Sequence, residues 1–200
     1  SVELKAGDKV LDLCASPGSK TTAIALRSRS ISNDILICAG DVSGPRTAFL
    51  KHNCHSQACD AVAVLQFDAA YGLPFADANF DTVLVDAPCS GTGTIRHNPE
   101  IRYHLTPDAF DGFASKQLAI LRSASNLVKV GGSLIYSTCS LEREENEAVS
   151  AAFLSGRDDF EALVPNVPDR FYGVDRFART FPHRDRMDGF FIASFRKVPN

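Results

Sequence analysis

Short apolar runs bounded by turn residues alternate with amphipathic stretches along most of this chain of 200 residues. A short apolar run between turn signals is typical of a buried strand. The predicted strands are Lys9–Leu13, Asp34–Ala39, Ala61–Gln66, Thr82–Asp86, Ser133–Tyr136 and Phe190–Phe195. The pattern therefore predicts a sheet built from segments spread over the whole chain.

The amphipathic stretches between these strands predict helices. Ser43 precedes Pro45, and Thr106 precedes Pro107, so each serves as an N-cap with proline in the first helical turn. Gly131-Gly132 follows the end of the longest of these segments. The predicted helices are Gly18–Arg29, Ser43–His55, Thr106–Val128 and Glu142–Leu154.

Strands that alternate with helices predict an α/β fold with a doubly wound, mostly parallel sheet and right-handed crossovers. The last strand, Phe190–Phe195, is predicted to be an antiparallel edge strand. Residues 157–187 are rich in turn residues, which predicts a long irregular segment at the surface. A polar loop is predicted at Arg27–Asn33. A length of 200 residues fits a single domain.

The amino-acid composition indicates the environment in which the protein folds. Hydrophobic residues make up 44% and charged residues 22% of the chain, as in globular proteins in water. Neither a membrane-length apolar run nor a signal peptide occurs, so we expect a cytoplasmic protein without a membrane partner. Ser1 stands where a start methionine is expected, so we expect the chain to be trimmed from a longer protein.

The net charge of −3 is not that of a typical nucleic-acid-binding domain, which neutralises phosphates with a basic excess. A protein of this charge that acts on nucleic acid needs a local basic patch or another domain. One basic cluster occurs shortly after Cys89 and consists of Arg96, His97, Arg102 and His104. It is either a patch that contacts a nucleic-acid backbone or a solvated loop.

The six cysteines favour neither disulfides nor zinc. Disulfides are rare in cytosolic proteins. Cys-x-x-Cys does not occur, and Cys54 and Cys59 with His55 lack a second half of a zinc site, so no metal is expected. We interpret Cys38, Cys54 and Cys59 as structural.

Two other cysteines lie in short polar turns directly after predicted strands. Cys89 is in Asp86-Ala87-Pro88-Cys89-Ser90, and Cys139 is in Ser137-Thr138-Cys139-Ser140. The carboxyl ends of strands in an open α/β sheet are where such folds bind ligands. For a single cysteine we would favour a structural role, as a small buried hydrophobic residue. Two cysteines in such turns favour a functional role: a two-thiol reaction, a disulfide or a metal site.

A loop of small residues follows the first predicted strand. Small residues at a strand-to-helix turn let the backbone approach a ligand, although a tight structural turn is the alternative. The loop matches neither the phosphate-binding loop nor the Gly-x-Gly-x-x-Gly dinucleotide motif. It consists of Cys14, Ala15, Ser16, Pro17, Gly18, Ser19 and Lys20.

Carboxylates recur at the ends of the following strands. Asp41 follows the second strand, where it can accept the ribose hydroxyls of a nucleoside, and Asp68 follows the third, where it can accept an adenine amine. Asp86 follows the fourth. Beside the small-residue loop these acids favour a nucleoside ligand, either a dinucleotide or S-adenosylmethionine.

The chain resembles the Sun (Fmu-type) family of RNA cytosine-C5 methyltransferases. The blocks that carry the resemblance are 12–21, 86–93, 136–140 with Glu145-Asn146-Glu147 behind it, and 188–193. Ser16 and Ser19 stand where the family usually has Ala and Gly, and both are small. The resemblance implies one Rossmann-like methyltransferase domain over residues 1–200. It also implies an RNA-binding extension, often N-terminal, that this chain does not include.

The resemblance also implies site roles. Cys139 would be the nucleophile that adds to cytosine C6, Cys89 would assist release of the adduct, and Asp86 would bond the cytosine N3/N4 edge near the methionine end of the cofactor. Lys20 would lie by the base or the methionine carboxylate. S-Adenosylmethionine would be bound by Cys14, Ala15, Ser16, Pro17, Gly18, Ser19, Lys20, Asp41, Arg46, Asp68 and Asp86.

Three further points complete these expectations. The expected substrate is ribosomal RNA, with tRNA second, and the protein is expected to be a monomer. Glu145 and Glu147 are interpreted as helix-start residues, and Asn146 as a brace for the Cys139 turn. Two alternatives stay open: a DNA cytosine-C5 methyltransferase with Cys89 as nucleophile, and a nucleoside-binding assembly factor without catalysis.

Overall fold

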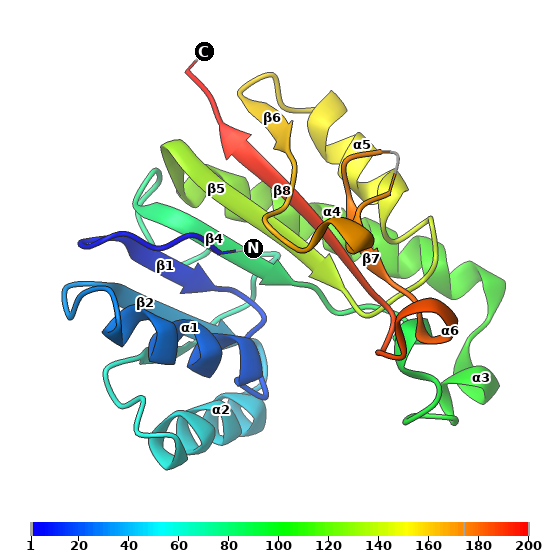
Figure 1. Ribbon diagram of the computed structural model, residues 1–200, viewed down its shortest axis with the longest axis horizontal. Coiled ribbons are helices and arrows are strands. Elements are labelled where there is room, and N and C mark those ends of the chain that lie inside the picture. The colour runs from blue at the N-terminus through cyan, green and yellow to red at the C-terminus, as the bar shows by residue number, and fades with distance from the viewer. Residues whose placement is uncertain (1, 174, 200) are drawn as a thin grey trace.

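A computed structural model describes residues 2–173 and 175–199, which form a single eight-stranded sheet with helices on both faces (Figure 1). The strand order is β3-β2-β1-β4-β5-β8-β6, and β7 pairs with β8. The strands are β1 Lys9–Asp12, β2 Leu36–Asp41, β3 Ala63–Gln66, β4 Phe80–Asp86, β5 Val128–Thr138, β6 Phe160–Leu163, β7 Ala178–Thr180 and β8 Phe190–Lys197. Strands β1 to β5 are parallel, and β8 pairs antiparallel to β5. The predicted fold class is confirmed, and β8 is antiparallel as predicted. It is not the outermost strand, however, because β6 and β7 pair with the side of β8 that faces away from β5.

The four longer helices lie close to the predicted ranges. The helices are α1 Ser19–Arg29, α2 Gly44–Ser56, α3 Ile101–His104, α4 Pro107–Leu127, α5 Glu147–Ser155 and α6 Pro182–Asp185. Helix α5 begins at Glu147 and not at Glu142, because Asn146 has a non-helical backbone and its side chain bonds to β5. Ser43 and Thr106 occupy the N-cap positions with extended backbones, but their side chains make no cap hydrogen bond.

The core has two hydrophobic clusters, one on each face of the sheet. Leu11 belongs to the cluster with α4 and α5, whereas its neighbour Val10 belongs to the cluster with α1 and α2. Val83 and Leu84 on β4 divide in the same way. This alternation is the period of two that a strand covered on both faces requires, and Figure 1 shows the two helix layers.

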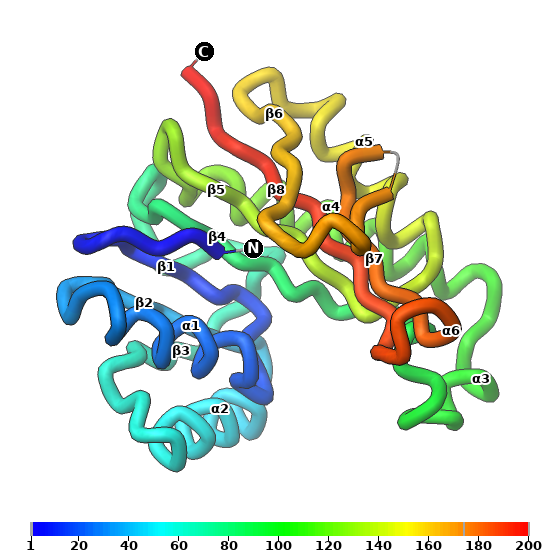
Figure 2. The backbone as a smooth tube through the Cα atoms, in the orientation of Figure 1, coloured from blue at the N-terminus to red at the C-terminus, as the bar shows by residue number. Residues whose placement is uncertain are grey.

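The stretch 157–187 contains two strands that the sequence did not predict. Figure 2 traces the chain from α5 through β6 and β7 to α6. Strand β6 pairs with the outer side of β8, and β7 also pairs with β8. These strands have four and three residues, and neither is a continuous apolar run in the sequence: β6 is Phe-Glu-Ala-Leu and β7 is Ala-Arg-Thr. Their position depends on tertiary contacts such as Phe160 against Phe153, with ring centroids 5.3 Å apart.

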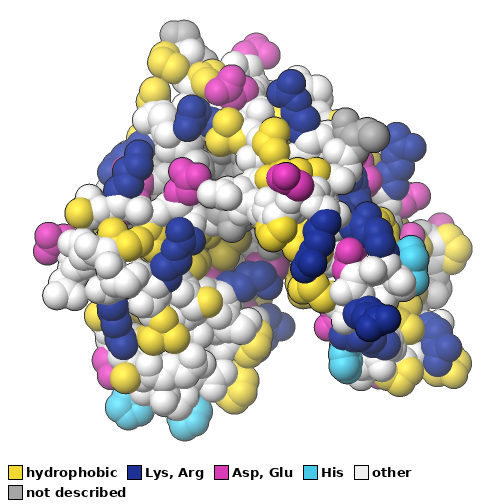
Figure 3. Space-filling model, viewed as in Figure 1, with side chains coloured by type: hydrophobic (Ala, Val, Ile, Leu, Met, Phe, Trp, Pro, Cys, Tyr) yellow, Lys and Arg dark blue, Asp and Glu magenta, His cyan; other side chains and the backbone are white. Residues whose placement is uncertain are grey.

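The parallel strands bring the predicted turns together at one edge of the sheet. Asp12 pairs in register with Leu84, and Asp86 pairs with Ser137. The loops that follow β1, β4 and β5 therefore emerge side by side. Figure 3 shows a hollow between the part carrying α1 and α2 and the part carrying α3 and α6.

Two further observations concern the rest of the described chain. In residues 2–173 and 175–199, no helix has the length and apolar character needed to cross a membrane. Cys38, Cys54 and Cys59 are buried and unbonded, as expected of structural cysteines. Burial raises the thiol pKa of both Cys38 and Cys54.

Candidate active site

A pocket of about 400 Å³ lies at the carboxyl ends of β1, β2 and β4. This volume is in the range of small-molecule sites. Its wall brings together eight of the residues that the sequence singled out: Cys14, Ser16, Asp41, Arg46, Asp68, Asp86, Cys89 and Cys139. Lys116 on α4 also lines the pocket. Lys116 was not predicted, since an exposed lysine on a helix gives no signal in a single sequence.

The loop of residues 14–20 is held by the elements beside it. The Ala15 N–H donates to the Gly40 carbonyl at 2.9 Å, and the Asn53 side chain donates to the Pro17 carbonyl at 2.7 Å. A Cβ on Gly18 would lie 2.9 Å from Leu50, at a backbone φ of +110°. Small residues are therefore needed here for packing as well as for ligand approach. Cys14 and Ser16 reach the pocket wall, whereas Ala15 is buried beneath it.

Cys14 is a neutral thiol in this setting. Burial, together with the nearby carboxylates of Asp12, Asp41 and Asp86, raises its pKa to about 12. A thiolate is the reactive form of cysteine. Cys14 therefore contributes an apolar wall and not a nucleophile.

The buried Asp41 pairs with Arg46, whose side chain is largely exposed, and this ion pair also holds the loop. The Arg46 Nε donates to the Asp41 carboxylate at 3.1 Å, and its guanidinium donates to the Ser16 carbonyl at 3.2 Å. The Ser16 hydroxyl returns a hydrogen bond to the Arg46 carbonyl at 3.1 Å. Asp41 is 4% exposed, so this pairing is what stabilises its charge.

Asp68 lines the same pocket and also stabilises its own turn. Its side chain accepts the Ala70 N–H at 2.9 Å, which is an Asx turn. Asp41 and Asp68 thus mark one end of the pocket, and Asp86 with the two thiols marks the other. A pocket with carboxylates along its wall suits a ligand that carries positive charge, and S-adenosylmethionine carries a sulfonium and an ammonium group.

The two thiols form a close pair. Cys89 Sγ and Cys139 Sγ are 3.2 Å apart. The hydrogen bond from Cys89 lowers the pKa of Cys139, and the charge of Lys20 adds to this effect. The same hydrogen bond, together with burial, raises the pKa of Cys89. Cys139 is therefore the thiol that ionises first, and Cys89 keeps its proton.

The backbone keeps the two cysteine turns together. The Gly93 N–H donates to the Cys139 carbonyl at 2.9 Å. A Cβ on Gly93 would lie 2.2 Å from the Gly189 carbonyl oxygen, so no other residue fits there without displacement of the backbone. The hydrogen bond to Cys139 and the close approach to Gly189 hold the turn after β4 against the turn after β5 and against the start of β8.

Asp86 uses both carboxylate oxygens. Lys20 Nζ lies 2.5 Å from one oxygen, and the Ser137 hydroxyl donates to the other at 2.6 Å. The Lys20 ammonium also lies 5.3 Å from the centroid of the Phe190 ring. Lys20 thus belongs to the Asp86 end of the site although it does not line the pocket.

Asp12 is a buried acid beneath the loop that the sequence did not assign to the site. Burial raises the pKa of its carboxyl to about 7. One oxygen accepts the Thr21 hydroxyl at 2.7 Å, and the other has no partner among the described residues. A carboxylate at the end of an apolar strand was the available signal, but its burial depends on α1 packing over it.

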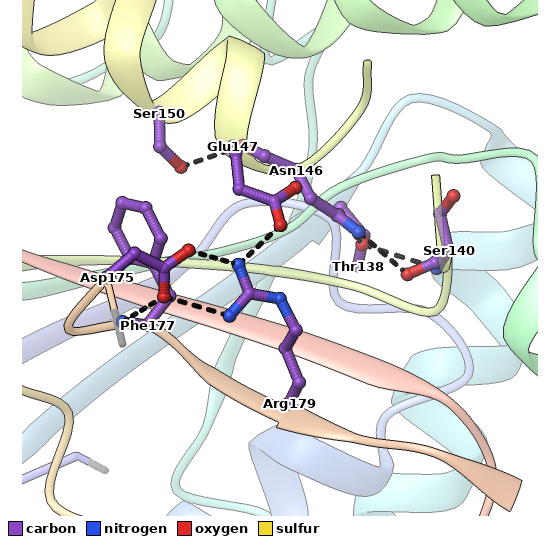
Figure 4. Close-up of polar contacts among 8 residues, drawn as sticks. All are labelled: Thr138, Ser140, Asn146, Glu147, Ser150, Asp175, Phe177 and Arg179. Carbon is purple, nitrogen blue, oxygen red and sulfur yellow. Dashed lines mark hydrogen bonds and ion pairs between the residues drawn. The ribbon is translucent and has the colours of Figure 1, made fainter. Parts of the chain in front are cut away.

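Asn146 braces the Cys139 turn, as expected. The Thr138 hydroxyl donates to Asn146 Oδ1 at 2.6 Å, and Asn146 Nδ2 donates to the Ser140 carbonyl at 2.9 Å (Figure 4). The next residue, Glu147, pairs with Arg179 on β7 at 2.5 Å. The turn is therefore connected through the start of α5 to the C-terminal part of the sheet.

A second pocket, of about 270 Å³, lies near the apolar side chains Leu84, Ile135 and Ile192. Its described wall contains neither thiol, but it includes Lys20 and Ser137, the two residues that contact Asp86. Within the described ranges, no group of three or more His, Cys, Asp or Glu side chains is arranged to hold a metal ion.

The fold and pocket define a class of protein: a Rossmann-like, S-adenosylmethionine-dependent methyltransferase. A "SAM dependent methyltransferase" from Aquifex aeolicus has the same fold, with a TM-score of 0.63 and 14% identity over 98% of this chain and 85% of that chain. The family model described as "16S rRNA methyltransferase RsmB/F" matches residues 1–196. The chain belongs to this family, and the resemblance to the Sun (Fmu-type) family is confirmed.

Relatives agree with this assignment. The chain is 36% identical over 203 residues to the "Probable ribosomal RNA small subunit methyltransferase B" of Bacillus subtilis, covering 98% of this chain and 45% of that protein. It is 36% identical over 199 residues to the "Ribosomal RNA small subunit methyltransferase F" of Escherichia coli O1:K1, covering 96% and 41%. The chain thus spans less than half the length of these relatives.

A solved structure points to the cofactor. NSun6 from Pyrococcus horikoshii was crystallised with SFG, an S-adenosylmethionine analogue. It has a TM-score of 0.85 and 29% identity, covering 98% of this chain and 50% of that one. S-Adenosylmethionine is the cofactor of this family.

Proposed function

We propose that the protein transfers a methyl group from S-adenosylmethionine to C5 of a cytosine in ribosomal RNA, in the cytoplasm. The observation that carries the proposal is the thiol pair, 3.2 Å apart, with the pKa of Cys139 lowered and that of Cys89 raised. The names of the relatives support ribosomal RNA. The monomeric state and an RNA-binding region beyond this chain stay predictions.

Cys139 starts the reaction. Its thiolate forms a bond to C6 of the cytosine, and the electron pair of the C5–C6 double bond makes C5 nucleophilic. When bound, the cofactor supplies the electrophilic methyl group that C5 takes. The target base must leave any stack to reach the thiol. Asp86 would hold the N3/N4 edge, with Lys20 beside it at 2.5 Å.

Cys89 ends the reaction. After methylation, C5 must lose its proton so that the bond between Cys139 and C6 can break and expel the thiolate. Once the Cys139 sulfur is bonded to carbon it no longer carries a charge, so one cause of the raised pKa of Cys89 is removed. Cys89 would then release its own proton to solvent and, as a thiolate, accept the C5 proton, or it would position another base that accepts this proton.

The cofactor would lie in the 400 Å³ pocket. Asp41 would accept the ribose hydroxyls while Arg46 keeps the carboxylate in place, and Asp68 would accept the adenine amine. Cys14 and Ser16 line the pocket and would face the methionine part. Ala15 and residues 17–20 do not line the pocket, and their place in the cofactor site rests on the family resemblance. These assignments follow from the wall of the pocket and from the family resemblance.

Helix α3 would contact the RNA backbone. Arg96 and His97 lie 2.7 Å and 3.5 Å from Asp188, so this acid offsets part of their charge. Arg102 and His104 on α3 are exposed to solvent. These two side chains are the better candidates for phosphate contacts.

A methyl-transfer assay tests the proposal. Full-length protein would be incubated with tritiated S-adenosylmethionine and total RNA from cells that lack the enzyme, and the RNA would be digested to nucleosides. We expect label in 5-methylcytidine from the small-subunit ribosomal RNA, and none with Cys139→Ala. Label in another nucleoside, or cofactor binding without transfer, would reject the proposal, the latter in favour of a non-catalytic assembly factor.

A further inference from the structure

Glu145 is a fully buried carboxylate that the reaction above does not use. It lies between the Cys139 turn and the start of α5. Its Oε2 accepts the Ser90 N–H at 2.9 Å and the Gln117 side-chain amide at 2.8 Å. Its Oε1 accepts the Ser140 hydroxyl at 2.6 Å and the Ser90 hydroxyl.

The donors on Glu145 come from both cysteine turns. Ser90 directly follows Cys89, and Ser140 directly follows Cys139. The two serine hydroxyls also lie 3.1 Å from each other. Gln117 on α4 also donates to the Pro88 carbonyl at 3.0 Å, on the other side of Cys89. One side chain therefore joins the turns after β4 and β5 and fixes both to a long helix.

The groups that donate hydrogen bonds to the Glu145 side chain are all neutral, and none of them is a cation. None of the ion pairs within the described ranges includes Glu145. A buried carboxylate is costly unless hydrogen bonds satisfy it. Here the four donors are held in the geometry that the carboxylate dictates, which makes Glu145 suited to setting the positions of its neighbours.

We propose that Glu145 is a positioning residue that sets the separation of the Cys89 and Cys139 thiols through Ser90 and Ser140. It is fully buried and does not line the 400 Å³ pocket. The consequence for catalysis rests on the proposed function, but the consequence for the thiol pair does not. Glutamine would keep the four contacts, because its oxygen can accept at the Oε2 position and its amide can donate to the two hydroxyls.

The first test measures the thiol pair without RNA. Hydrogen peroxide oxidises the Cys139 thiolate to a sulfenic acid with release of hydroxide, and attack by Cys89 then forms a disulfide and releases water. The rate of this disulfide depends on the separation of the sulfurs, and mass spectrometry of Cys89–Cys139 peptides measures it. Full-length wild type is compared with Glu145→Ala, Glu145→Gln and the exposed control Glu144→Ala.

We expect Glu145→Ala to slow disulfide formation about tenfold or more, since small displacements of reacting groups have large effects on rate. Glu145→Gln should restore most of the rate, and Glu144→Ala should match wild type. An unchanged rate in Glu145→Ala, or a loss in Glu145→Gln as large as in Glu145→Ala, would overturn the proposal. If Glu145→Ala does not fold, as judged by circular dichroism, the double variant Ser90→Ala/Ser140→Ala takes its place with the same expectation.

The second test measures methyl transfer by the same variants. We expect Glu145→Ala to lower kcat with little change in KM for RNA, because the residue does not contact substrate. A wild-type protein that transfers no methyl group would reject the proposed function, while the disulfide rates would still decide the role of Glu145. A raised KM with an unchanged kcat would contradict a role in positioning the thiols.

Discussion

The two thiols differ in charge state although they are the same residue type. Cys139 accepts the hydrogen bond of Cys89, and Lys20 adds a positive charge nearby, so the pKa of Cys139 is lowered. Cys89 is the donor and is more enclosed, so its pKa is raised. The division between a nucleophile and a proton-holding partner therefore follows from the contact of 3.2 Å together with the deeper burial of Cys89 and the charge of Lys20 near Cys139.

That contact predicts the effect of removing Cys89. In Cys89→Ala the thiolate of Cys139 loses its hydrogen-bond donor, so the pKa of Cys139 should rise. The pH dependence of Cys139 alkylation by iodoacetamide, followed by mass spectrometry, measures this pKa. Cys89→Ser is the matched control, because its hydroxyl still donates. A midpoint that is the same in wild type and Cys89→Ala would contradict the account.

Asp12 predicts a pH dependence of stability. Its carboxyl has a pKa of about 7 in the folded protein and 3.8 as the reference value. Between these values the folded state binds the proton and the unfolded state does not, so the free energy of unfolding falls as pH rises from about 4 to 7. The stabilisation by the proton on Asp12 is fully present below the reference pKa of 3.8 and is lost above the folded-state pKa of about 7. Its size is on the order of 4 kcal/mol.

Asp12→Asn tests this by urea unfolding at a series of pH values. The amide oxygen can still accept the Thr21 hydroxyl, and it carries no titrating proton, so the fall in stability between pH 4 and 7 should become smaller. Asp77→Asn, at an exposed position, is the control. Equal pH dependence in wild type and Asp12→Asn would show that Asp12 is not protonated at neutral pH.

Single residues also show what a sequence can and cannot predict. The turns of Cys89 and Cys139 were predictable because each follows an apolar run directly. Asp12 was not assigned a role, and Glu145 was interpreted as a helix-start residue although it precedes α5, because burial and hydrogen-bond partners decide what these two residues do. Glu145 is joined to Ser90 across 55 sequence positions, and no local pattern encodes that contact.

At the scale of elements, the long helices were predictable because their patterns extend over many residues, and the parallel strands because each contains an apolar run between turn residues. Strands β6 and β7 were not predicted, since they contain polar residues and depend on the partners they pack against. Phe153 of α5 is such a partner: it is fully buried, and its ring centroid lies 5.3 Å from that of Phe160 and 5.0 Å from that of Phe195.

Phe153→Ala should therefore loosen the antiparallel side of the sheet. Removing a buried phenylalanine costs about 3–5 kcal/mol of unfolding free energy. Chemical denaturation measures the total loss, and hydrogen exchange should show the largest increase in β6 and β8. Phe49→Ala, at a half-exposed position on α2, is the matched control and should cost less than about 1 kcal/mol. Similar losses in both variants would reject this packing account.

At the scale of the whole molecule, the hollow in Figure 3 separates the part with α1 and α2 from the part with α3 and α6. The 400 Å³ pocket opens at the carboxyl ends of the strands, and the basic residues of α3 lie in the segment that follows the Cys89 turn. With a net charge of −3, attraction to RNA must come from such a local surface or from other parts of the full-length protein.

The double variant Arg102→Ala/His104→Ala tests this surface. We expect weaker RNA binding and a salt dependence reduced by about one per lost phosphate contact. Fluorescence anisotropy with full-length protein at several salt concentrations measures both, and cofactor affinity should not change. Arg29→Ala, at the end of α1, is the control. RNA affinity and salt dependence equal to wild type would exclude α3 from the RNA surface.

The central claim is that Cys139 attacks the base and Cys89 permits its release. The most direct measurement is the amount of protein–RNA complex that survives denaturing electrophoresis after full-length variants are incubated with RNA and S-adenosylmethionine. Cys89→Ala should accumulate this covalent complex, because release is slowed more than attack, and Cys139→Ala should form none. A covalent complex in Cys139→Ala that is absent in Cys89→Ala would reverse the two roles and contradict the account.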